Sequence, residues 1–263
     1  MPIVKREGGT HHEWMDTSQL ALLDAHVQEE KRQRHKRERE AEREARVRRA
    51  YRTAVMRGML DGEAPVRFPA PEQSCCWGNT CSGLLADRST RLAVIICHPW
   101  GPMGGTMHDF CVTTLLTLFA DAGLTTLRFN FRYGLGRGHS SASDLRAACD
   151  MLRSLQAPPD KLLLVGYSYG SLVVADVAPG RPDVAAFALI SPPLGAASAL
   201  FFGRNVTERA QASHKPKLAI IGSHDQFCSQ RRFDQFARGL QEPSVCMCVC
   251  VHVCVYVYVC MYA

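Results

Sequence analysis

The chain is 263 residues long, with 46% hydrophobic and 21% charged residues. That balance is ordinary for a globular protein and suffices for one large domain or two small ones. The formal net charge of +6 is concentrated in residues 29–52, where eleven lysines and arginines stand against six glutamates. The rest of the chain is close to neutral, which excludes a charge-based argument for nucleic-acid binding outside that segment.

The first thirty residues are too polar for a secretory signal. Charged residues are spread through them, and no apolar stretch reaches seven residues. No uninterrupted apolar run of 18 residues occurs before the last twenty residues. We therefore expect a cytoplasmic protein, with the nucleus as the alternative location, and no membrane partner.

The twelve cysteines do not form the pattern of a disulfide framework, because five of them lie in the last twenty residues. Cys97 and Cys111 fall in apolar surroundings, where a buried free thiol is the usual state. Cys75, Cys76 and Cys81 lack the second pair and the histidine spacing of a zinc site. We expect no metal and no cofactor.

Residues 18–57 have the composition of a long, solvent-exposed helix. Apolar side chains are too sparse in its middle to bury a face, so Glu–Arg pairs four residues apart are the main local support. Its basic cluster, Lys31–Arg37, is either a nuclear-targeting or RNA-contacting patch or part of a solvated arm that docks on another protein. Interleaved glutamates and the lack of aromatic side chains favour the docking arm over nucleic acid.

From residue 62 the composition becomes that of a globular domain, with weak strand signals up to residue 89. Apolar strands are then expected at 92–97, 124–129, 161–165, 184–190 and 217–221, and helices at 106–122, 143–156, 169–178 and 229–238. This alternation predicts an α/β fold, a mostly parallel sheet with helices on both faces. We expect a charged helical extension over 1–61, an α/β domain over 62–243, and a low-complexity Val/Cys/Tyr tail over 244–263.

The most informative motif is the pentapeptide Gly-Tyr-Ser-Tyr-Gly at Gly166–Gly170. It follows the apolar run Lys161–Val165 and opens the run Ser171–Ala175, so Ser168 stands between a strand and a helix. This is the setting of a nucleophile elbow, whose flanking glycines allow the tight turn. A chance match in a loop is the alternative, and the strand–turn–helix context favours the elbow.

Acyl transfer by a serine also requires a base, an orienting acid and donors for the developing oxyanion. The loop His98–Gly105 follows an apolar strand and precedes a helix. Its two prolines have no N–H, so Trp100 or Gly101 is the expected backbone donor, together with Tyr169 directly after the nucleophile. The alternative is a plain glycine-rich turn before a helix.

The expected acid is Asp225, which comes shortly after the strand at 217–221. A carboxylate at the carboxyl end of a later strand is in the right place to orient a catalytic histidine. The alternative is that Asp225 only forms a turn through its own backbone hydrogen bonds. His224 is expected to be a neighbour of the site without a role in it.

Residues 92–228 resemble the α/β-hydrolase superfamily, and specifically its small lidless members related to dienelactone hydrolases and serine aminopeptidases. The segments that carry the resemblance are His98-Pro99, Gly104-Gly105, Leu127–Arg132, Gly134, Gly136, Gly138, Asp144–Arg146, Gly166–Gly170, Ser191–Leu194 and Gly222–Asp225. The resemblance covers roughly half of the chain. It implies an open pocket for small acyl groups and the chain order nucleophile, acid, base.

Only His252 follows Asp225 and could therefore be the base. Residues 245–262, however, alternate strictly between Val or Met and Cys, His or Tyr. Period two is a strand signal, and it is also what a translated GT-rich repeat produces. We therefore hypothesise that such a repeat has replaced the natural last strand and catalytic histidine, and we expect the sheet to lack that strand. The alternative is that His252 itself serves as the base.

The sequence thus predicts a serine hydrolase if the triad Ser168, Asp225 and His252 is complete. Such an enzyme cleaves an ester, thioester or amide of a small acyl-containing substrate through an acyl-Ser168 intermediate. The alternative is a catalytically inactive hydrolase-fold scaffold or interaction protein that lacks the catalytic histidine.

Overall fold

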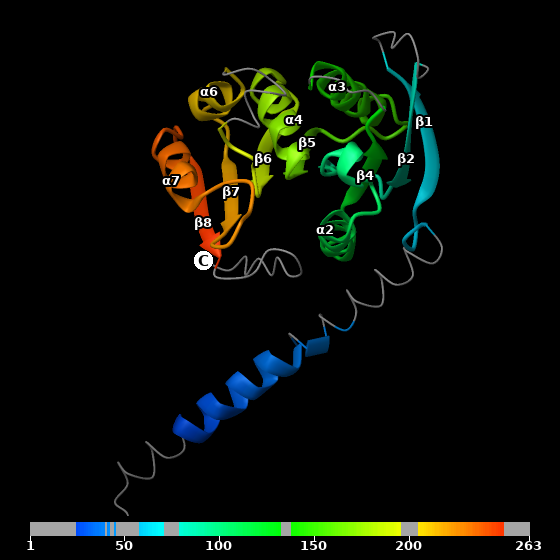
Figure 1. The fold of residues 1–263 in the computed structure, drawn as a ribbon. Helices are drawn as coiled ribbons and strands as arrows, with labels where there is room; N and C mark the ends of the chain where they lie inside the picture. Colours follow the sequence, from blue (N-terminus) through cyan, green and yellow to red (C-terminus); the bar gives the residue numbers. More distant parts are fainter. Residues whose placement is uncertain are drawn as a thin grey trace, which may run out of the picture. The chain divides into compact units, whose positions relative to one another are not determined.

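The computed structural model describes residues 25–39, 41–42, 45, 58–70, 79–132, 138–195 and 205–249. The chain divides into two compact units, residues 1–49 and 50–263. In the first unit, residues 25–39 form an exposed helix (Figure 1). Pairs four residues apart support it, among them Arg34 with Glu38 at 3.6 Å. The exposed helix predicted for 18–57 is present in these residues, and the rest of the predicted span, apart from residues 41–42 and 45, lies outside the described residues.

The second unit is built on an eight-stranded sheet with the strand order β1-β2-β4-β3-β5-β6-β7-β8 (Figure 1). The strands are β1 (Ala64–Pro69), β2 (Thr80–Ala86), β3 (Leu92–Cys97), β4 (Thr125–Asn130), β5 (Lys161–Tyr167), β6 (Val184–Ile190), β7 (Lys217–Gly222) and β8 (Ser244–Val249). Strand β2 pairs antiparallel with β1 and β4, and the other pairs are parallel. The predicted α/β fold with a mostly parallel sheet is confirmed.

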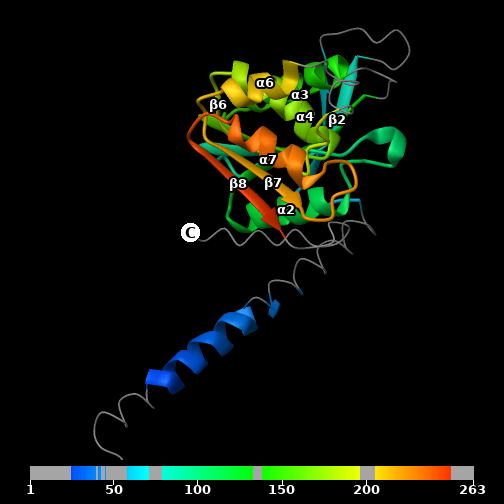
Figure 2. The same cartoon turned by 60° about the vertical axis from the view of Figure 1, so that its left-hand side comes forward.

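Helices cover both faces of this sheet. They are α2 (Phe110–Asp121), α3 (His139–Arg153), α4 (Tyr169–Val177), α6 (Asn205–Ala212) and α7 (Gln230–Arg238), with short 3-10 turns η1 (Gly101–Met103) and η2 (Ala178–Gly180). Helix α2 lies on one face, and α3, α4, α6 and α7 lie on the other (Figures 1 and 2).

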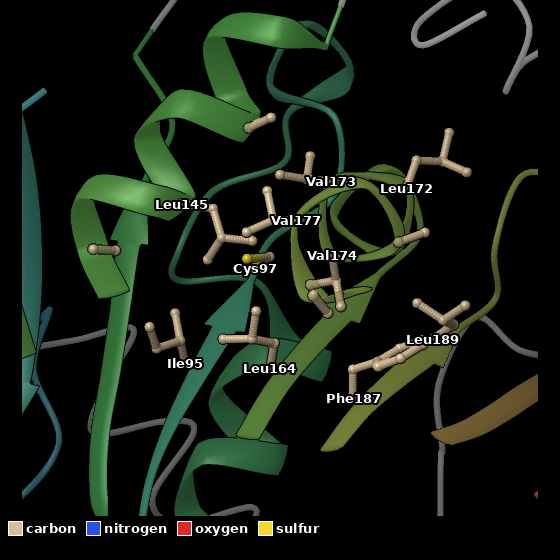
Figure 3. Close-up of a cluster of buried hydrophobic side chains, with 14 of the residues drawn as sticks. Ile95, Cys97, Leu145, Leu164, Leu172, Val173, Val174, Val177, Phe187 and Leu189 are labelled. Atoms are coloured by element: carbon tan, nitrogen blue, oxygen red, sulfur yellow. The ribbon is translucent and has the colours of Figure 1, made fainter. Parts of the chain in front are cut away.

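The core fills the space between the sheet and its helices on both sides. Ile95 and Leu164 pack beneath Val174 of α4 on one face (Figure 3), whereas Val94 and Ile96 pack against α2 on the other. Successive strand residues point to opposite faces, so a strand buried on both sides must be apolar throughout. This is why β3 and β5 read as near-continuous apolar runs.

Several elements besides β8 differ from the sequence expectation. Strands β1 and β2 form an antiparallel pair at one edge of the sheet, where the strand signals were weak. Helix α6 was not predicted, because its sequence is polar and, over residues 206–212, its buried side chains are Val206 and Ala210, four residues apart. Helix α2 begins at Phe110 rather than at 106, because the Asp109 side chain accepts a hydrogen bond from the Cys111 N–H at 2.8 Å and caps it there.

The expectation that the last strand is missing was wrong for residues 244–249. They form β8, which pairs in parallel with β7 from Lys217 opposite Ser244 to Gly222 opposite Val249. No residue of β8 is buried, and Val245 is 57% exposed. An edge strand needs mainly its backbone donors and acceptors to pair, so a low-complexity sequence of β-branched and small residues suffices.

The topology predicts a crevice at the carboxyl ends of the central strands. From β3 the chain passes to β4 on one side, and β5 lies on the other side of β3. Loops that leave the carboxyl ends of such strands in opposite directions open a crevice, which is where ligands bind in open α/β sheets. His98 follows the carboxyl end of β3, and Ser168 follows the carboxyl end of β5.

Candidate active site

Ser168 occupies a strained turn between β5 and α4. Its backbone has φ 51° and ψ −119°, a conformation that costs a residue with a side chain roughly 1–3 kcal/mol. A Cβ atom on Gly166 would lie 2.4 Å from the Gly170 carbonyl oxygen, and one on Gly170 would lie 2.4 Å from that of Cys97. Both positions therefore require glycine, and the predicted elbow geometry is present.

The turn is held from two sides. The Ser168 N–H donates to the Ile190 carbonyl at 2.8 Å, which ties the elbow to the end of β6. The Ser171 N–H and hydroxyl both donate to the Ser168 carbonyl, at 2.9 and 2.5 Å. Helix α4 begins at Tyr169, so the positive end of its dipole lies next to the serine, which favours negative charge there.

His98 is buried and neutral, and it supports the start of the loop after β3. Its Nε2 must accept, because the Phe131 N–H donates to it at 3.0 Å. The proton is thus on Nδ1, which donates to the Pro99 carbonyl at 2.5 Å. Burial lowers the pKa of His98 to about 4. A histidine engaged at both nitrogens is a structural support here and is poorly suited to act as the base.

The candidate oxyanion donors line one hollow. Trp100, Gly101 and Tyr169 contribute to its wall together with His98, Phe131 and Ser141. The Trp100 carbonyl accepts from the N–H groups of Met103 and Gly105, both at 3.1 Å, which folds the loop back on itself. The structure therefore brings the three predicted donor residues together beside the elbow.

Two further contacts shape this hollow. The Tyr169 hydroxyl donates to Ser141 Oγ at 2.9 Å, and the Tyr169 ring meets the Phe131 ring edge-on at 5.9 Å. Arg132 donates to the Asp144 carboxylate from its backbone N–H at 2.8 Å and from Nε at 2.6 Å. Burial raises the pKa of Asp144, and the hydrogen bonds from Arg132 oppose that rise. These contacts fix the chain after β4 against α3.

Sequence reasoning assigned no role to the residues at the end of β4. Asn130, Phe131 and Arg132 line the hollow, although they stood in a segment that carried only the family resemblance. A usable signal was present, because a polar residue directly after an apolar strand lies at the carboxyl edge where ligands bind.

Asp225 lies in the turn after β7. Its Oδ1 accepts hydrogen bonds from the N–H groups of Phe227 and Cys228, both at 2.9 Å. Its Oδ2 accepts none from the described residues. Strand β6 lies between β5, which Ser168 follows, and β7, which Asp225 follows. His224, the predicted bystander, is exposed and contacts Ser223 Oγ through Nδ1 at 2.9 Å.

His252 lies outside the described residues. The last of these, Val249, ends β8 opposite Gly222, and the Ser223 N–H donates to its carbonyl at 2.9 Å. Among the described residues, no helix has the length and apolarity that crossing a bilayer requires.

A model of the alpha/beta hydrolase family matches residues 94–252, which is more than half of the chain. The chain belongs to the α/β-hydrolase family. The matched span includes the elbow, the loop after β3, Asp225 and His252. An uncharacterized protein of Rickettsia prowazekii is 30% identical over 107 residues, which are 38% of this α/β hydrolase and 44% of that relative. The chain thus spans less than half the length of this curated relative.

Solved structures with the fold of this α/β hydrolase include serine hydrolases and esterases. A serine hydrolase without a lid from Xanthomonas campestris is 23% identical, with a TM-score of 0.58 over 72% of this chain and 84% of that one. A serine hydrolase homologue from Coxiella burnetii is 25% identical, with a TM-score of 0.56 over 72% and 88%. An esterase of Pyrococcus furiosus is 18% identical, with a TM-score of 0.60 over 71% and 80%. Family and fold together support hydrolase activity.

Proposed function

We propose that this protein cleaves an ester, thioester or amide through an acyl-Ser168 intermediate. The observation that carries the proposal is the backbone of Ser168, held at φ 51° between β5 and α4. Strain of this kind persists only where the surrounding structure enforces it, and it is typical of a nucleophile presented above a sheet edge.

The chemistry proceeds in two half-reactions. Ser168 Oγ forms a bond to the acyl carbon while its proton passes to the base, and the backbone N–H of Tyr169 with that of Trp100 or Gly101 stabilises the oxyanion. The base returns the proton to the leaving group as the bond between carbon and leaving group breaks. Water then attacks the acyl-Ser168 ester in the same way, which releases the acid and restores the serine.

His252 is our candidate for the base, and Asp225 for the acid that orients it. The family match extends to His252. Along the chain, His252 follows Val249 by three residues as Asp225 follows Gly222, and Val249 and Gly222 are paired across β7 and β8. The Asp225 Oδ2 atom is the acceptor we propose for the imidazole N–H.

The hollow beside the elbow favours a small acyl group. Aromatic side chains of Trp100, Phe131 and Tyr169 line it, and Ser141 adds a hydroxyl. We expect acetyl-sized esters to react faster than long-chain esters.

The test is labelling of the full chain with a fluorophosphonate, in which Ser168 Oγ bonds to phosphorus and fluoride leaves. We expect stoichiometric labelling that maps to Ser168 and is lost in Ser168→Ala. An unlabelled but folded parent would count in favour of the inactive scaffold and against this proposal.

A further inference from the structure

The segment Arg128–Arg132 at the end of β4 forms or breaks no bond in the proposed chemistry, yet it contacts both ends of the loop after β3. We call residues 98–107 the oxyanion loop, since they contain Trp100 and Gly101. Strand β4 lies beside β3 in the sheet, so side chains at its carboxyl end reach the loop directly.

The far end of the oxyanion loop is held at Met107. The Met107 N–H donates to Asn130 Oδ1 at 2.8 Å, and the Met107 carbonyl accepts from Arg128 Nη1 at 2.9 Å. Residues two apart on a strand point to the same face, which explains how both side chains reach one residue. The two polar backbone groups of Met107 are thus bound by β4.

The near end is held at His98. The Phe131 N–H donates to His98 Nε2, and His98 Nδ1 donates to the Pro99 carbonyl. A trans peptide is planar, with its C=O and N–H pointing in opposite directions. Fixing the Pro99 carbonyl therefore fixes the direction of the Trp100 N–H.

Arg128 is itself immobile. Its Nε and Nη2 donate to the two carboxylate oxygens of Glu63 at 2.8 and 2.6 Å, and the side chains are 0% and 1% exposed. A fully buried bidentate pair of this kind keeps a defined geometry, because separating the two charges in the interior is costly. The anchor at Met107 is therefore rigid.

We propose that Asn130 is a positioning residue that holds the oxyanion loop through the Met107 N–H. Two residues before Met107, the Gly105 N–H donates to the Trp100 carbonyl. A short stretch of backbone and one hydrogen bond therefore connect Met107 to the proposed oxyanion donors. This role rests on the proposed function, in which a misplaced donor slows acylation.

The amide side chain suits the task. Because Met107 N–H is a donor, it fixes the orientation of the Asn130 amide, with the oxygen toward Met107. Leucine has nearly the same shape and no acceptor, whereas aspartate keeps the acceptor. A matched control is Thr126→Val on the same face of β4, because Thr126 Oγ1 has no hydrogen-bond partner among the described residues.

The experiment measures hydrogen–deuterium exchange at the Met107 amide and fluorophosphonate inactivation in the full chain. Asn130→Leu is expected to lose protection at Met107 and to lower the maximal inactivation rate roughly 10- to 100-fold, with little change in the half-saturating probe concentration. Asn130→Asp keeps the acceptor and is expected to keep the protection. Thr126→Val is expected to match the parent in both readouts.

Unchanged Met107 exchange in Asn130→Leu would overturn the proposal, and so would lost protection with an unchanged inactivation rate. An unreactive parent would sink the proposed function alone, because exchange at Met107 still decides whether Asn130 holds the loop.

Discussion

Ser168 and Asp225 both follow strands of the same parallel sheet, but their surroundings differ. The nucleophile and its proposed donors sit at the centre of the sheet, where β3 and β5 have neighbours on both sides and helices on both faces. The proposed acid follows β7, the strand next to the edge of the sheet, and the candidate base follows the edge strand β8 along the chain, in which no residue is buried.

The nucleophile and the contacts that hold it do not depend on the end of the chain. The strained backbone of the serine, the glycines that allow its turn and the hydrogen bonds that hold the turn and the neighbouring loop all come from residues 63–191. The proposed base, His252, comes after Val249, the last residue of β8. Substitutions in each half can therefore test the two halves separately. We expect substitution of the candidate base to slow acylation the most.

Removal of the candidate base tests the edge half most strongly. If His252 activates Ser168, His252→Ala is expected to slow acylation roughly 10⁵- to 10⁶-fold, as loss of a triad base does elsewhere. Pre-steady-state kinetics with an activated acetyl ester measures this. Acylation at the parental rate would show that the base lies elsewhere.

Asp225→Asn separates the two roles of the carboxylate. The amide oxygen still accepts from the N–H groups of Phe227 and Cys228, so the turn and the thermal midpoint are expected to stay near those of the parent. Acylation is expected to fall roughly 10⁴-fold, because an amide cannot hold the imidazole in the correct tautomer. A normal rate in Asp225→Asn would reduce Asp225 to a turn residue.

Gly170→Ala tests the central half through packing. The added Cβ would meet the Cys97 carbonyl oxygen at 2.4 Å, and both atoms belong to buried residues, so we expect a loss of roughly 1–3 kcal/mol in the free energy of unfolding. Gly180→Ala is the control, since its Cβ would meet only Arg209 Nη2 at 4.0 Å. Denaturant unfolding of both variants decides, and equal stability would contradict the close approach.

His98 predicts a pH dependence of stability. Its pKa is about 4 in the folded chain and ordinarily 6.5, so the unfolded chain binds more protons between these values. Stability therefore falls as the pH falls through that window, by about 3 kcal/mol from this group, and levels off below it. The raised pKa of Asp144 acts in the opposite direction.

The readout is the difference between the parent and His98→Gln, in which the contributions of other groups cancel. Unfolding at about pH 7 and about pH 4.5, values on either side of the ordinary histidine pKa, is expected to show a smaller drop for His98→Gln. Equal drops in the two proteins would mean that His98 is not held neutral.

The same contrast explains how much the sequence could predict. Ser168, its glycines and strands β3 and β5 were predictable, because a strained turn and a doubly buried strand restrict residue choice severely. Asp225 was predicted as the orienting acid because it follows β7. The roles of Asn130 and Arg128 were not predictable, because their partners, Met107 and Glu63, lie 23 and 65 residues away and no local pattern links them.

Strand β8 was missed for the opposite reason. An exposed edge strand imposes so few demands on its side chains that a repeat-like sequence satisfies it, and composition alone pointed away from a structured element. Helix α6 was missed likewise, since two of its residues are buried over the described range 206–212.

Detection of an acyl group on Ser168 tests the proposed acyl-enzyme intermediate itself. The full chain is mixed with an activated acetyl ester, quenched in acid within milliseconds to seconds, and its intact mass is measured, with Ser168→Ala in parallel. We expect a transient species heavier by one acetyl group, mapped to Ser168 and missing from the variant. Ester hydrolysis without that species, or the same adduct in Ser168→Ala, would contradict the proposed intermediate.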